Sequence, residues 1–332
     1  MRRIVSVCLL FSLLALLFSS CGDEGVDETV FAMDTAVIFK LSGEKASSAF
    51  SAAKEELFRL GTLLDAEGET LQALADGESI QNAELAVLLS RASELGDKTG
   101  GALDVTLYPA VKLWGFVDQK YRVPSEDELE SLKPYIDYHG ISIKNNEISL
   151  PGGVEITLGA VAKGYTGDRL AEICRESGVE SGILSLGGNV RLIGDKSGAP
   201  FKVAVRSPEG GNALMLALSD TNIITSGGYE RYFEENGEIY HHILDPRTLA
   251  PVRNELTSMT VISPDGTMAD ALSTALFVMG RDKAMEYYRK YGAEDGFEVV
   301  LLTDKREAFL SEGLRGSFLS ASEEYQVTYF GR

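Results

Sequence analysis

Cysteine is scarce in this chain, with three in 332 residues. Cys8 lies inside an N-terminal apolar stretch and Cys21 directly follows it, so only Cys174 belongs to the body of the chain. A single cysteine forms no internal disulfide and builds no cysteine-based metal centre. Cys174 falls within a predicted helix, where we expect a small buried apolar side chain.

Basic residues are also few, with 31 Lys and Arg against 50 Asp and Glu and a formal net charge of −19. This deficit argues against a nucleic-acid partner, because affinity for nucleic acid depends on basic contacts to phosphate. A ligand that carries phosphate would need local compensation from a metal ion, a lysine or a helix N-terminus. The apolar share of 44% is that of a globular protein with a substantial core.

Long apolar runs are absent except near the start, where Val5 to Phe18 is almost unbroken. The run is too short to span a bilayer comfortably, and it follows two arginines and precedes small residues. Residues 1–20 are therefore interpreted as a cleaved signal peptide. The alternative is an uncleaved membrane anchor.

The end of this run, Leu17-Phe18-Ser19-Ser20-Cys21, resembles the lipobox of bacterial lipoproteins, with Phe18 in place of the usual aliphatic residue. The resemblance implies a lipid on Cys21 and makes residues 21–29 a lipidated acidic tether. It places the chain at the periplasmic face of the bacterial inner membrane. The alternative is simple cleavage that leaves Cys21 unmodified.

Beyond the tether, the apolar pattern predicts both helices and hairpins. Helical spacing predicts helices over 46–64, 83–99, 160–177, 268–279 and 282–291. Runs of β-branched and aromatic residues predict strands over 30–41, 201–206, 214–218, 222–226, 259–263 and 298–303. Turn residues predict hairpins over 141–150 and 232–243. Because the strands come in hairpins, we expect an α+β fold with antiparallel sheets flanked by helices. No linker divides residues 30–332, so we expect a single domain of two lobes that share a cleft.

Histidine is rare, and two of the three lie side by side as His241 and His242. Imidazole is the side chain best suited to proton transfer near neutral pH. The pair follows a predicted hairpin and precedes the Asp245-Pro246 turn. The segment is therefore a candidate for acid–base chemistry. The alternative is one solvated histidine and one that is hydrogen-bonded in the core.

Asp270 and Thr274 lie four residues apart near the start of a predicted apolar helix, so they share one helix face. A carboxylate and a hydroxyl are hard oxygen ligands, which suit Mg²⁺ rather than Zn²⁺. The alternative is helix capping by Asp270, with the Thr274 hydroxyl bonded to the backbone.

The segment Leu158 to Tyr165 is rich in small residues, carries Lys163 and leads into a predicted helix. Glycine allows close backbone approach, and a helix start beside a lysine favours an anion. The glycine spacing matches neither a P-loop nor a dinucleotide fingerprint. The alternative is a tight turn with a solvated lysine. Taken alone, Trp114 is interpreted as a core residue.

Together, in this order, these segments resemble the FAD:protein FMN transferase family, also called ApbE. The resemblance covers about residues 31 to 320. It is carried by Met33-Asp34-Thr35, Gly101-Ala102-Leu103-Asp104-Val105-Thr106 with Leu113-Trp114-Gly115-Phe116, Leu158-Gly159-Ala160-Val161-Ala162-Lys163-Gly164-Tyr165, Ser185-Leu186-Gly187-Gly188-Asn189, Thr225-Ser226-Gly227-Gly228-Tyr229, His242-Ile243-Leu244-Asp245-Pro246-Arg247-Thr248 and Asp270-Ala271-Leu272-Ser273-Thr274-Ala275.

The resemblance implies a two-lobed fold and a reaction. FAD is the substrate, and Mg²⁺ binds at its pyrophosphate. The hydroxyl of an acceptor serine or threonine attacks the FMN phosphorus, AMP leaves, and FMN stays on the acceptor flavoprotein through a phosphoester. The rival reaction uses water in place of the acceptor, which makes the chain an FAD pyrophosphatase. A third possibility is an FAD-binding lipoprotein without turnover.

The resemblance also implies a role for each matching residue. The implied metal ligands are Asp270, Thr274, the backbone oxygen of Ala160 and an oxygen of Ser273. The implied FAD contacts are Met33, Ala102, Leu103, Asp104, Thr157, Lys163 and the backbone of Leu244. His242 would lie near the pyrophosphate, and either Asp270 or His242 would be the base.

The chain departs from the family pattern at several positions. Asp34, Ala160 and Leu249 stand where glycine is common in the family, and Thr157 stands where aspartate is frequent. A block that often borders the flavin is poorly matched over residues 67–80.

Overall fold

The computed structural model describes residues 25–331. The predicted signal peptide over 1–20 and the predicted lipid site at Cys21 lie outside the described residues. Within residues 25–331, no helix combines the length and the apolar character needed to cross a membrane.

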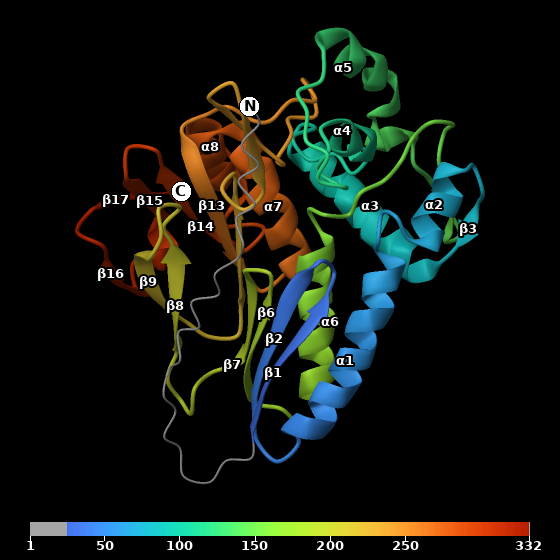
Figure 1. The fold of residues 1–332 in the computed structure, drawn as a ribbon. Helices are drawn as coiled ribbons and strands as arrows, with labels where there is room; N and C mark the ends of the chain where they lie inside the picture. The colour runs from blue at the N-terminus through green and yellow to red at the C-terminus, as the bar shows by residue number, and fades with distance from the viewer. Residues whose placement is uncertain (1–24, 332) are drawn as a thin grey trace.

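A nine-stranded sheet forms the centre of the molecule (Figure 1). Its strands, in spatial order, are β1 (Gly25–Ala32), β2 (Thr35–Ser42), β6 (Ser181–Leu186), β7 (Asn189–Gly194), β10 (Asn222–Gly227), β13 (Leu256–Ser263), β14 (Glu298–Thr303), β15 (Glu307–Ser311) and β17 (Gln326–Phe330). Neighbouring strands are antiparallel except the last pair, β15 and β17, which is parallel. The predicted α+β class with antiparallel sheets is confirmed.

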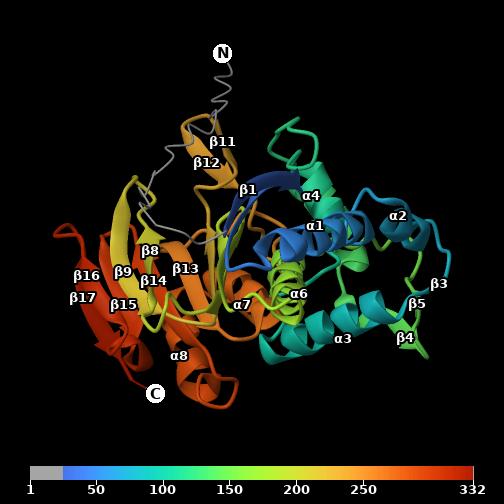
Figure 2. The ribbon, with the colours of Figure 1, turned by 90° about the horizontal axis from the view of Figure 1, so that it is seen from below.

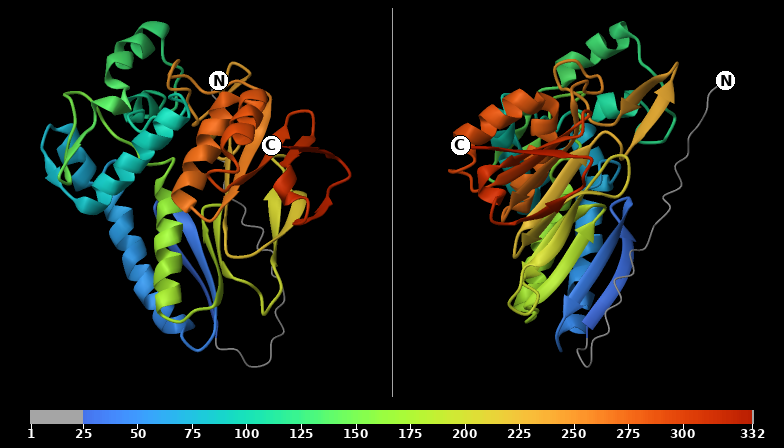
Figure 3. Two further views of the ribbon diagram at one scale, coloured as in Figure 1. Left: turned by 180° about the vertical axis from the view of Figure 1, so that it is seen from behind. Right: turned by 90° about the vertical axis from the view of Figure 1, so that its left-hand side faces the viewer.

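Four helices cover one face of this sheet (Figure 3). They are α1 (Ala46–Leu63), α6 (Ala162–Glu176), α7 (Gly266–Met279) and α8 (Arg281–Tyr291). Each packs against the next in the order α1, α6, α7, α8. Part of the opposite face carries a three-stranded sheet of β8 (Phe201–Arg206), β9 (Asn212–Leu218) and β16 (Phe318–Ala321).

The central strands β13 and β14 are buried almost throughout because both of their faces are covered. Alternate side chains point to opposite faces of a strand. Val261 and Leu301 accordingly pack in the core beneath the helices, whereas Ile262 and Leu302 pack against the three-stranded sheet. Such strands appear in sequence as continuous apolar runs rather than as alternating patterns.

A second group of elements lies beside α7 and α6 (Figure 1). It contains α2 (Glu69–Ala75), α3 (Ala83–Lys98), α4 (Tyr108–Leu113), α5 (Glu126–Leu132) and a small sheet of β3 (Ile80–Gln81), β4 (Ser142–Lys144) and β5 (Glu147–Ser149). Short 3-10 helices cover Lys133–Tyr135, Tyr138–Gly140 and Glu312–Leu314. The hairpin of β11 (Tyr232–Glu235) and β12 (Glu238–His241) projects from the layers (Figure 2).

One predicted strand is wrong. Residues 30–41 are not one strand but parts of β1 and β2, which turn at Met33 and Asp34. Both turn residues have positive φ, 52° and 57°. A two-residue turn of this kind is usually signalled by Asn-Gly or Asp-Gly, and Met-Asp lacks that signal. The apolar run therefore looks continuous in the sequence.

Candidate active site

Helices α6 and α7 touch backbone to backbone at a pair of glycines. A Cβ atom on Gly164 would lie 2.0 Å from the carbonyl oxygen of Gly266, and one on Gly266 would lie 2.5 Å from that of Gly164. No side chain fits at either position. The close approach brings the first turn of α6 against the Asp270 side chain of α7.

Asp270 is 3% exposed and accepts two hydrogen bonds from neutral groups. The backbone N–H of Gly164 donates to Oδ2 over 2.8 Å, and Nδ2 of Asn189 donates to Oδ1 over 2.9 Å. Within residues 25–331, no lysine, arginine or histidine forms an ion pair with Asp270. A buried carboxylate without a cationic partner is costly unless a cation binds beside it.

Helix capping does not explain Asp270, because the N-cap of α7 is Asp265. Its side chain accepts a hydrogen bond from the backbone N–H of Met268 over 2.8 Å. Asp270 instead lies one turn inside the helix. The capping alternative for Asp270 is therefore wrong.

Hydroxyl groups gather next to Asp270. Ser226 Oγ of β10 lies 2.8 Å from Ser273 Oγ and 3.1 Å from Thr274 Oγ1. Ser273 Oγ also donates to the backbone oxygen of Asp270 over 2.9 Å. Ser226 has no counterpart among the predicted site residues, although it lies in one of the glycine-rich segments that the sequence singles out.

Ala160 lies in the turn before α6, because that helix begins at Ala162 rather than at residue 160. In a regular first turn, the amide of residue 164 would bond to the carbonyl of residue 160. The amide of Gly164 donates to Asp270 instead. The Ala160 carbonyl oxygen consequently has no hydrogen-bond donor among the described residues.

These groups form a set of hard oxygen atoms that suits a small divalent cation. It comprises one carboxylate, one free backbone carbonyl and several hydroxyls, which is the chemistry that Mg²⁺ accepts and Zn²⁺ does not favour. No group of three or more His, Cys, Asp or Glu side chains with metal-binding geometry occurs in residues 25–331. The donor set therefore fits the predicted Mg²⁺, with Asp270 as its only charged side chain.

Lys163 and Glu230 are charged residues close to this oxygen set. Lys163 Nζ donates to the Gly159 carbonyl over 3.3 Å at the start of α6. Glu230 follows β10, and its Oε1 would lie 3.8 Å from a Cβ atom on Gly188, next to the Asn189 that bonds to Asp270. Glu230 was not predicted from the sequence, because a glutamate after a glycine pair has no distinguishing signal there.

The Glu230 carboxyl is exposed, yet it has a perturbed pKa. Desolvation by the surrounding protein raises the pKa of Glu230, the positive charge of Lys163 opposes this rise, and the negative charge of Asp270 adds to it. The charges of Lys163 and Asp270 therefore both act on the Glu230 carboxyl.

The two adjacent histidines have different roles. His241 Nε2 lies 2.9 Å from the Val252 carbonyl, and its Nδ1 accepts the backbone N–H of Ile243 over 3.3 Å. Both ring nitrogens are thus satisfied by the backbone, and burial lowers the pKa of His241. His241 is a structural residue.

Only one ring nitrogen of His242 has a hydrogen-bond partner in the part of the chain that the structure describes. Its Nδ1 lies 3.1 Å from the Arg231 carbonyl, which only accepts, so Nδ1 carries the proton in the neutral ring. The ring edge faces Phe116, with 6.4 Å between the two ring centroids. Nε2 is then a lone-pair acceptor. Desolvation and the positive charge of Arg231 lower the pKa of His242 to about 3.

This geometry predicts the titration of all three histidines. Because the folded state holds His242 neutral well below its usual pKa near 6.5, the fold loses stability as pH falls from 6.5 towards 3. We expect the ring signals of His242 to stay unchanged between pH 5 and 8 in ¹⁵N-edited NMR spectra, and those of His241 to titrate below pH 6.5. His139, whose pKa the Asp137 carboxylate raises, should titrate above pH 6.5. Assignment uses His242→Gln, and a midpoint near 6.5 for His242 would contradict its assigned environment.

A backbone hydrogen bond joins Thr157 to the segment that contains the predicted FAD contacts Ala102, Leu103 and Asp104. The Thr157 N–H donates to the Val105 carbonyl over 2.8 Å, and its Oγ1 accepts the N–H of Gly159 over 3.3 Å. Ala102 and Leu103 are buried. Asp104 Oδ1 accepts both the backbone N–H and the hydroxyl of Thr106, over 2.8 and 2.6 Å, and burial raises the pKa of Asp104.

The other two predicted FAD contacts lie at turns. Met33 occupies the tip of the β1–β2 hairpin, where its side chain packs beside Gly61 of α1. Leu244 is buried with Trp114 and Phe116, and Trp114 donates from Nε1 to the Leu249 carbonyl over 2.8 Å. Leu249 itself has a φ of 57°, the conformation that favours glycine. Hydrogen bonds through Ser226 thus bring Ser273 and Thr274 together beside Asp270. The roles of these residues as metal ligands, and of all the predicted FAD contacts, stay predictions.

Comparisons with known proteins agree with this arrangement. A profile of the ApbE family matches residues 33–301. The FAD:protein FMN transferase of Treponema pallidum is 30% identical over 300 residues, which cover 80% of this chain and 82% of that protein. The crystal structure of the ApbE protein of Thermotoga maritima superposes with a TM-score of 0.79 at 31% identity and covers 90% of this chain and 97% of that one. The flavin transferase ApbE of Vibrio cholerae shares the fold, with a TM-score of 0.76 at 24% identity over 92% of this chain and 99% of that one. The chain belongs to the ApbE family.

Proposed function

We propose that this protein transfers FMN from FAD to a serine or threonine hydroxyl of an acceptor protein in a Mg²⁺-dependent reaction that releases AMP. The observation that carries the proposal is the buried carboxylate of Asp270 in α7, which has no ion-pair partner within the described chain. It accepts the amide of Gly164 in α6, and that amide would otherwise bond to the Ala160 carbonyl. The relatives that are named FAD:protein FMN transferases supply the reaction class.

Asp270, Thr274, the Ala160 carbonyl and Ser273 would hold the metal ion. When bound, Mg²⁺ would neutralise the negative charge of the FAD pyrophosphate while FMN is transferred. Lys163 lies in the first turn of α6 and adds a positive charge beside the metal ligands. The N-terminus of α6 itself also favours an anion there. Together these groups offset the repulsion that a chain with a net charge of −19 exerts on FAD.

The transfer step forms a bond between the acceptor oxygen and the FMN phosphorus and breaks the bond between that phosphorus and the AMP oxygen. The acceptor proton must go to a base. Asp270 already accepts hydrogen bonds on both carboxylate oxygens. The Nε2 of His242 is open to accept a new hydrogen bond, because its Nδ1 is fixed as the donor to the Arg231 carbonyl. We therefore assign the base to His242 rather than to Asp270.

The decisive experiment incubates the purified full-length protein in non-ionic detergent with FAD and Mg²⁺, with and without a candidate acceptor flavoprotein. AMP and protein-bound flavin are measured in parallel. We expect AMP and covalent flavin together and only with the acceptor. AMP without an acceptor would make the protein an FAD pyrophosphatase. Binding of FAD without any AMP would leave only an FAD-binding lipoprotein.

We also propose that the protein is anchored by a lipid on Cys21 at the periplasmic face of the inner membrane. The support is the sequence of residues 1–21 alone. The test compares the membrane and soluble fractions of cells that express either the natural chain or Cys21→Ser. Equal membrane association of the two proteins would reject the lipid anchor.

A further inference from the structure

An interhelical network of five polar side chains joins α1, α3 and α6 where the second group of elements meets the helix layer (Figure 1). Tyr165 and Arg169 come from α6, Glu56 and Arg59 from α1, and Glu84 from the first turn of α3. The transfer steps proposed above use none of these five side chains. The network therefore calls for an explanation of its own.

The contacts of the interhelical network form a closed circuit. The Tyr165 hydroxyl donates to Oε1 of Glu84 over 2.6 Å. Arg59 binds two carboxylates at once, with Nη1 at 2.7 Å from Oε2 of Glu84 and Nε at 2.7 Å from Oε2 of Glu56. Nε of Arg169 lies 3.8 Å from Oε1 of Glu56 and leads back to α6, one turn after Tyr165. The hydrogen bond from Arg59 lowers the pKa of Glu84, so this carboxylate is ionised at neutral pH and accepts from Tyr165.

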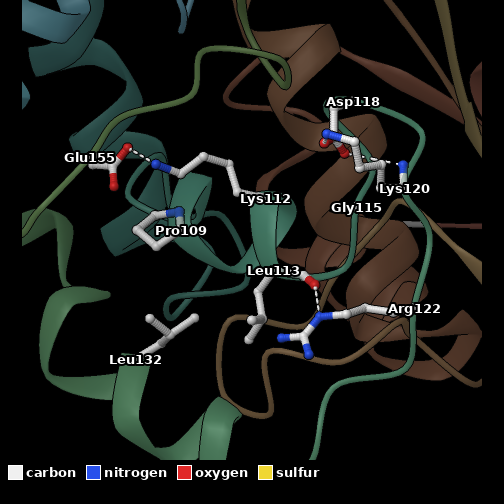
Figure 4. A pocket seen from close by; sticks show the side chains of 9 residues that line it. All are labelled: Pro109, Lys112, Leu113, Gly115, Asp118, Lys120, Arg122, Leu132 and Glu155. Carbon is white, nitrogen blue, oxygen red and sulfur yellow. Dashed lines mark hydrogen bonds and ion pairs between the residues drawn. The ribbon is translucent and has the colours of Figure 1, made fainter.

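The network differs from the isolated ion pairs elsewhere in the second group of elements. In the pocket of about 510 Å³ beside α4, Lys112 pairs with Glu155 and Lys120 with Asp118 (Figure 4). The Lys120 side chain is 84% exposed, and isolated pairs of this kind contribute little to stability. The carboxylates that the network takes from α1 and α3 are instead only 14% and 26% exposed. Linked and partly buried charges hold their helices in place more firmly than such pairs do.

The network holds the helix turn that borders the candidate active site. Tyr165 donates its own amide within the first turn of α6 over 3.0 Å, and the amide of Gly164 in that turn donates to Asp270 over 2.8 Å. The turn is therefore held from two sides, by Asp270 of α7 and by Glu84 of α3. The Ala160 carbonyl lies at the start of the same turn, so its position depends on both contacts.

Helix α3 also contacts α7 directly. Nη2 of Arg91 lies 3.1 Å from Oδ2 of Asp265, the residue that caps α7. The apolar face of α3 belongs to the same hydrophobic core as Ala102 and Leu103, two of the predicted FAD contacts. Helix α3 is therefore linked by side-chain contacts to both helices of the oxygen set and, through the core, to the predicted FAD segment.

We propose that Tyr165 and Glu84 are positioning residues for the transfer reaction, because their hydrogen bond fixes the first turn of α6 and with it the Ala160 carbonyl. The proposal rests on the transferase function proposed above. Neither side chain touches FAD in this role. Groups that bind a metal ion work only when the surrounding hydrogen bonds hold them in the productive geometry. Without the hydroxyl of Tyr165, the turn keeps its helical bonds but moves more freely against α3, and the oxygen set loosens.

Tyr165→Phe tests the proposal, because it removes only the hydroxyl and leaves Glu84 paired with Arg59. The purified full-length protein in non-ionic detergent is titrated with Mg²⁺ in a calorimeter in the presence of FAD. The Kd for Mg²⁺ should rise about 10-fold, which corresponds to about 1.4 kcal/mol. Hydrogen–deuterium exchange of the metal-free protein should become faster in the first turn of α6. In turnover, the KM for Mg²⁺ should rise as the Kd does, whereas kcat at saturating Mg²⁺ should stay within about 2-fold.

Tyr288→Phe is the matched control. The Tyr288 hydroxyl donates to Oε2 of Glu298 over 2.7 Å, between α8 and β14, so this variant loses the same kind of hydrogen bond away from the oxygen set. It should lower the melting temperature about as much as Tyr165→Phe does. The Kd for Mg²⁺ and the exchange of the first turn of α6 should stay those of the natural chain.

A double variant shows whether the two residues act through their shared bond. Tyr165→Phe combined with Glu84→Ala should bind Mg²⁺ as Glu84→Ala does alone, because the second change has no bond left to remove. Three results would overturn the proposal: natural exchange of the α6 turn in Tyr165→Phe, an equal rise of the Mg²⁺ Kd in Tyr288→Phe, or independent effects that multiply in the double variant. If the natural chain releases no AMP, the proposed function fails, while exchange and Mg²⁺ titration still decide the role of Tyr165 and Glu84.

Discussion

Replacement of Asp270 by asparagine should lower Mg²⁺-dependent release of AMP at least about 100-fold, because a bound metal contributes several kcal/mol to the transition state and each 1.4 kcal/mol is tenfold in rate. The variant removes the only carboxylate of the oxygen set. Calorimetric titration with Mg²⁺ in the presence of FAD should show loss of metal binding in the same variant. Turnover and Mg²⁺ affinity equal to those of the natural chain would reject the metal assignment.

The control for this experiment is Asp168→Asn, on the neighbouring helix α6. Asp168 accepts the backbone N–H of Gly266 over 2.6 Å and Nδ2 of Asn222 over 3.0 Å, and it pairs with Arg191. Its loss should reduce stability by roughly 1–3 kcal/mol through unsatisfied donors. Because Asp168 lies outside the oxygen set, its variant should still require Mg²⁺ with an unchanged affinity. Asp270→Asn also loses a hydrogen bond, so equal thermal shifts with unequal Mg²⁺ binding would separate the two roles.

Gly164→Ala should destabilise the fold by about 3 kcal/mol or more, the upper end of the usual cost of overpacking. The added methyl group meets the Gly266 carbonyl carbon and oxygen and the Asp270 Cβ atom, at 2.0 to 2.8 Å. Backbone atoms in the middle of two packed helices cannot rotate away as a side chain can. The helices must separate, and the hydrogen bond from the Gly164 amide to Asp270 should lengthen. Differential scanning calorimetry measures the loss of stability, and metal titration measures the effect on the site.

Gly152→Ala is the matched substitution for this measurement. Gly152 has no heavy atom within 4 Å of its Cβ position and lies in a turn away from helical contacts. Its variant should melt within a degree or two of the natural chain, because surface changes of this size are usually within about 0.5 kcal/mol. If the Gly164→Ala and Gly152→Ala variants had the same melting temperature, α6 and α7 would not touch as described.

Hairpins with asparagine turns and helices with regular apolar spacing could be predicted from the sequence. The turn at Asn145 and Asn146 has φ values of 51° and 64°, which asparagine adopts more readily than most residues. The β1–β2 hairpin was missed because Met33 occupies such a position without any local signal. The short helix α5 was also missed, although Ser125 and Glu128 form a capping box that could have revealed its start.

The site could be predicted only in part. Asp270 and Thr274 share a helix face, and spacing alone indicates this. That Asp270 lies inside the helix, buried and without a cationic partner, depends on how α6 crosses α7. Ser226 and Glu230 approach the site from β10 and the loop after it, and no local pattern in the sequence encodes that approach.

Periodicity and side-chain chemistry are enough to indicate the antiparallel α+β class, most helix positions and the residues able to carry charge or bind a metal. Which of these residues act together depends on how the helices and strands pack in three dimensions. Two glycines separated by more than a hundred residues let two helices touch, and this contact diverts one amide to Asp270 and leaves one carbonyl free. The path of the chain around the β11–β12 hairpin also separates the two histidines, because the Val252 carbonyl binds the ring of His241 and the Arg231 carbonyl binds that of His242. Such contacts arise from packing between elements, which local sequence patterns do not contain.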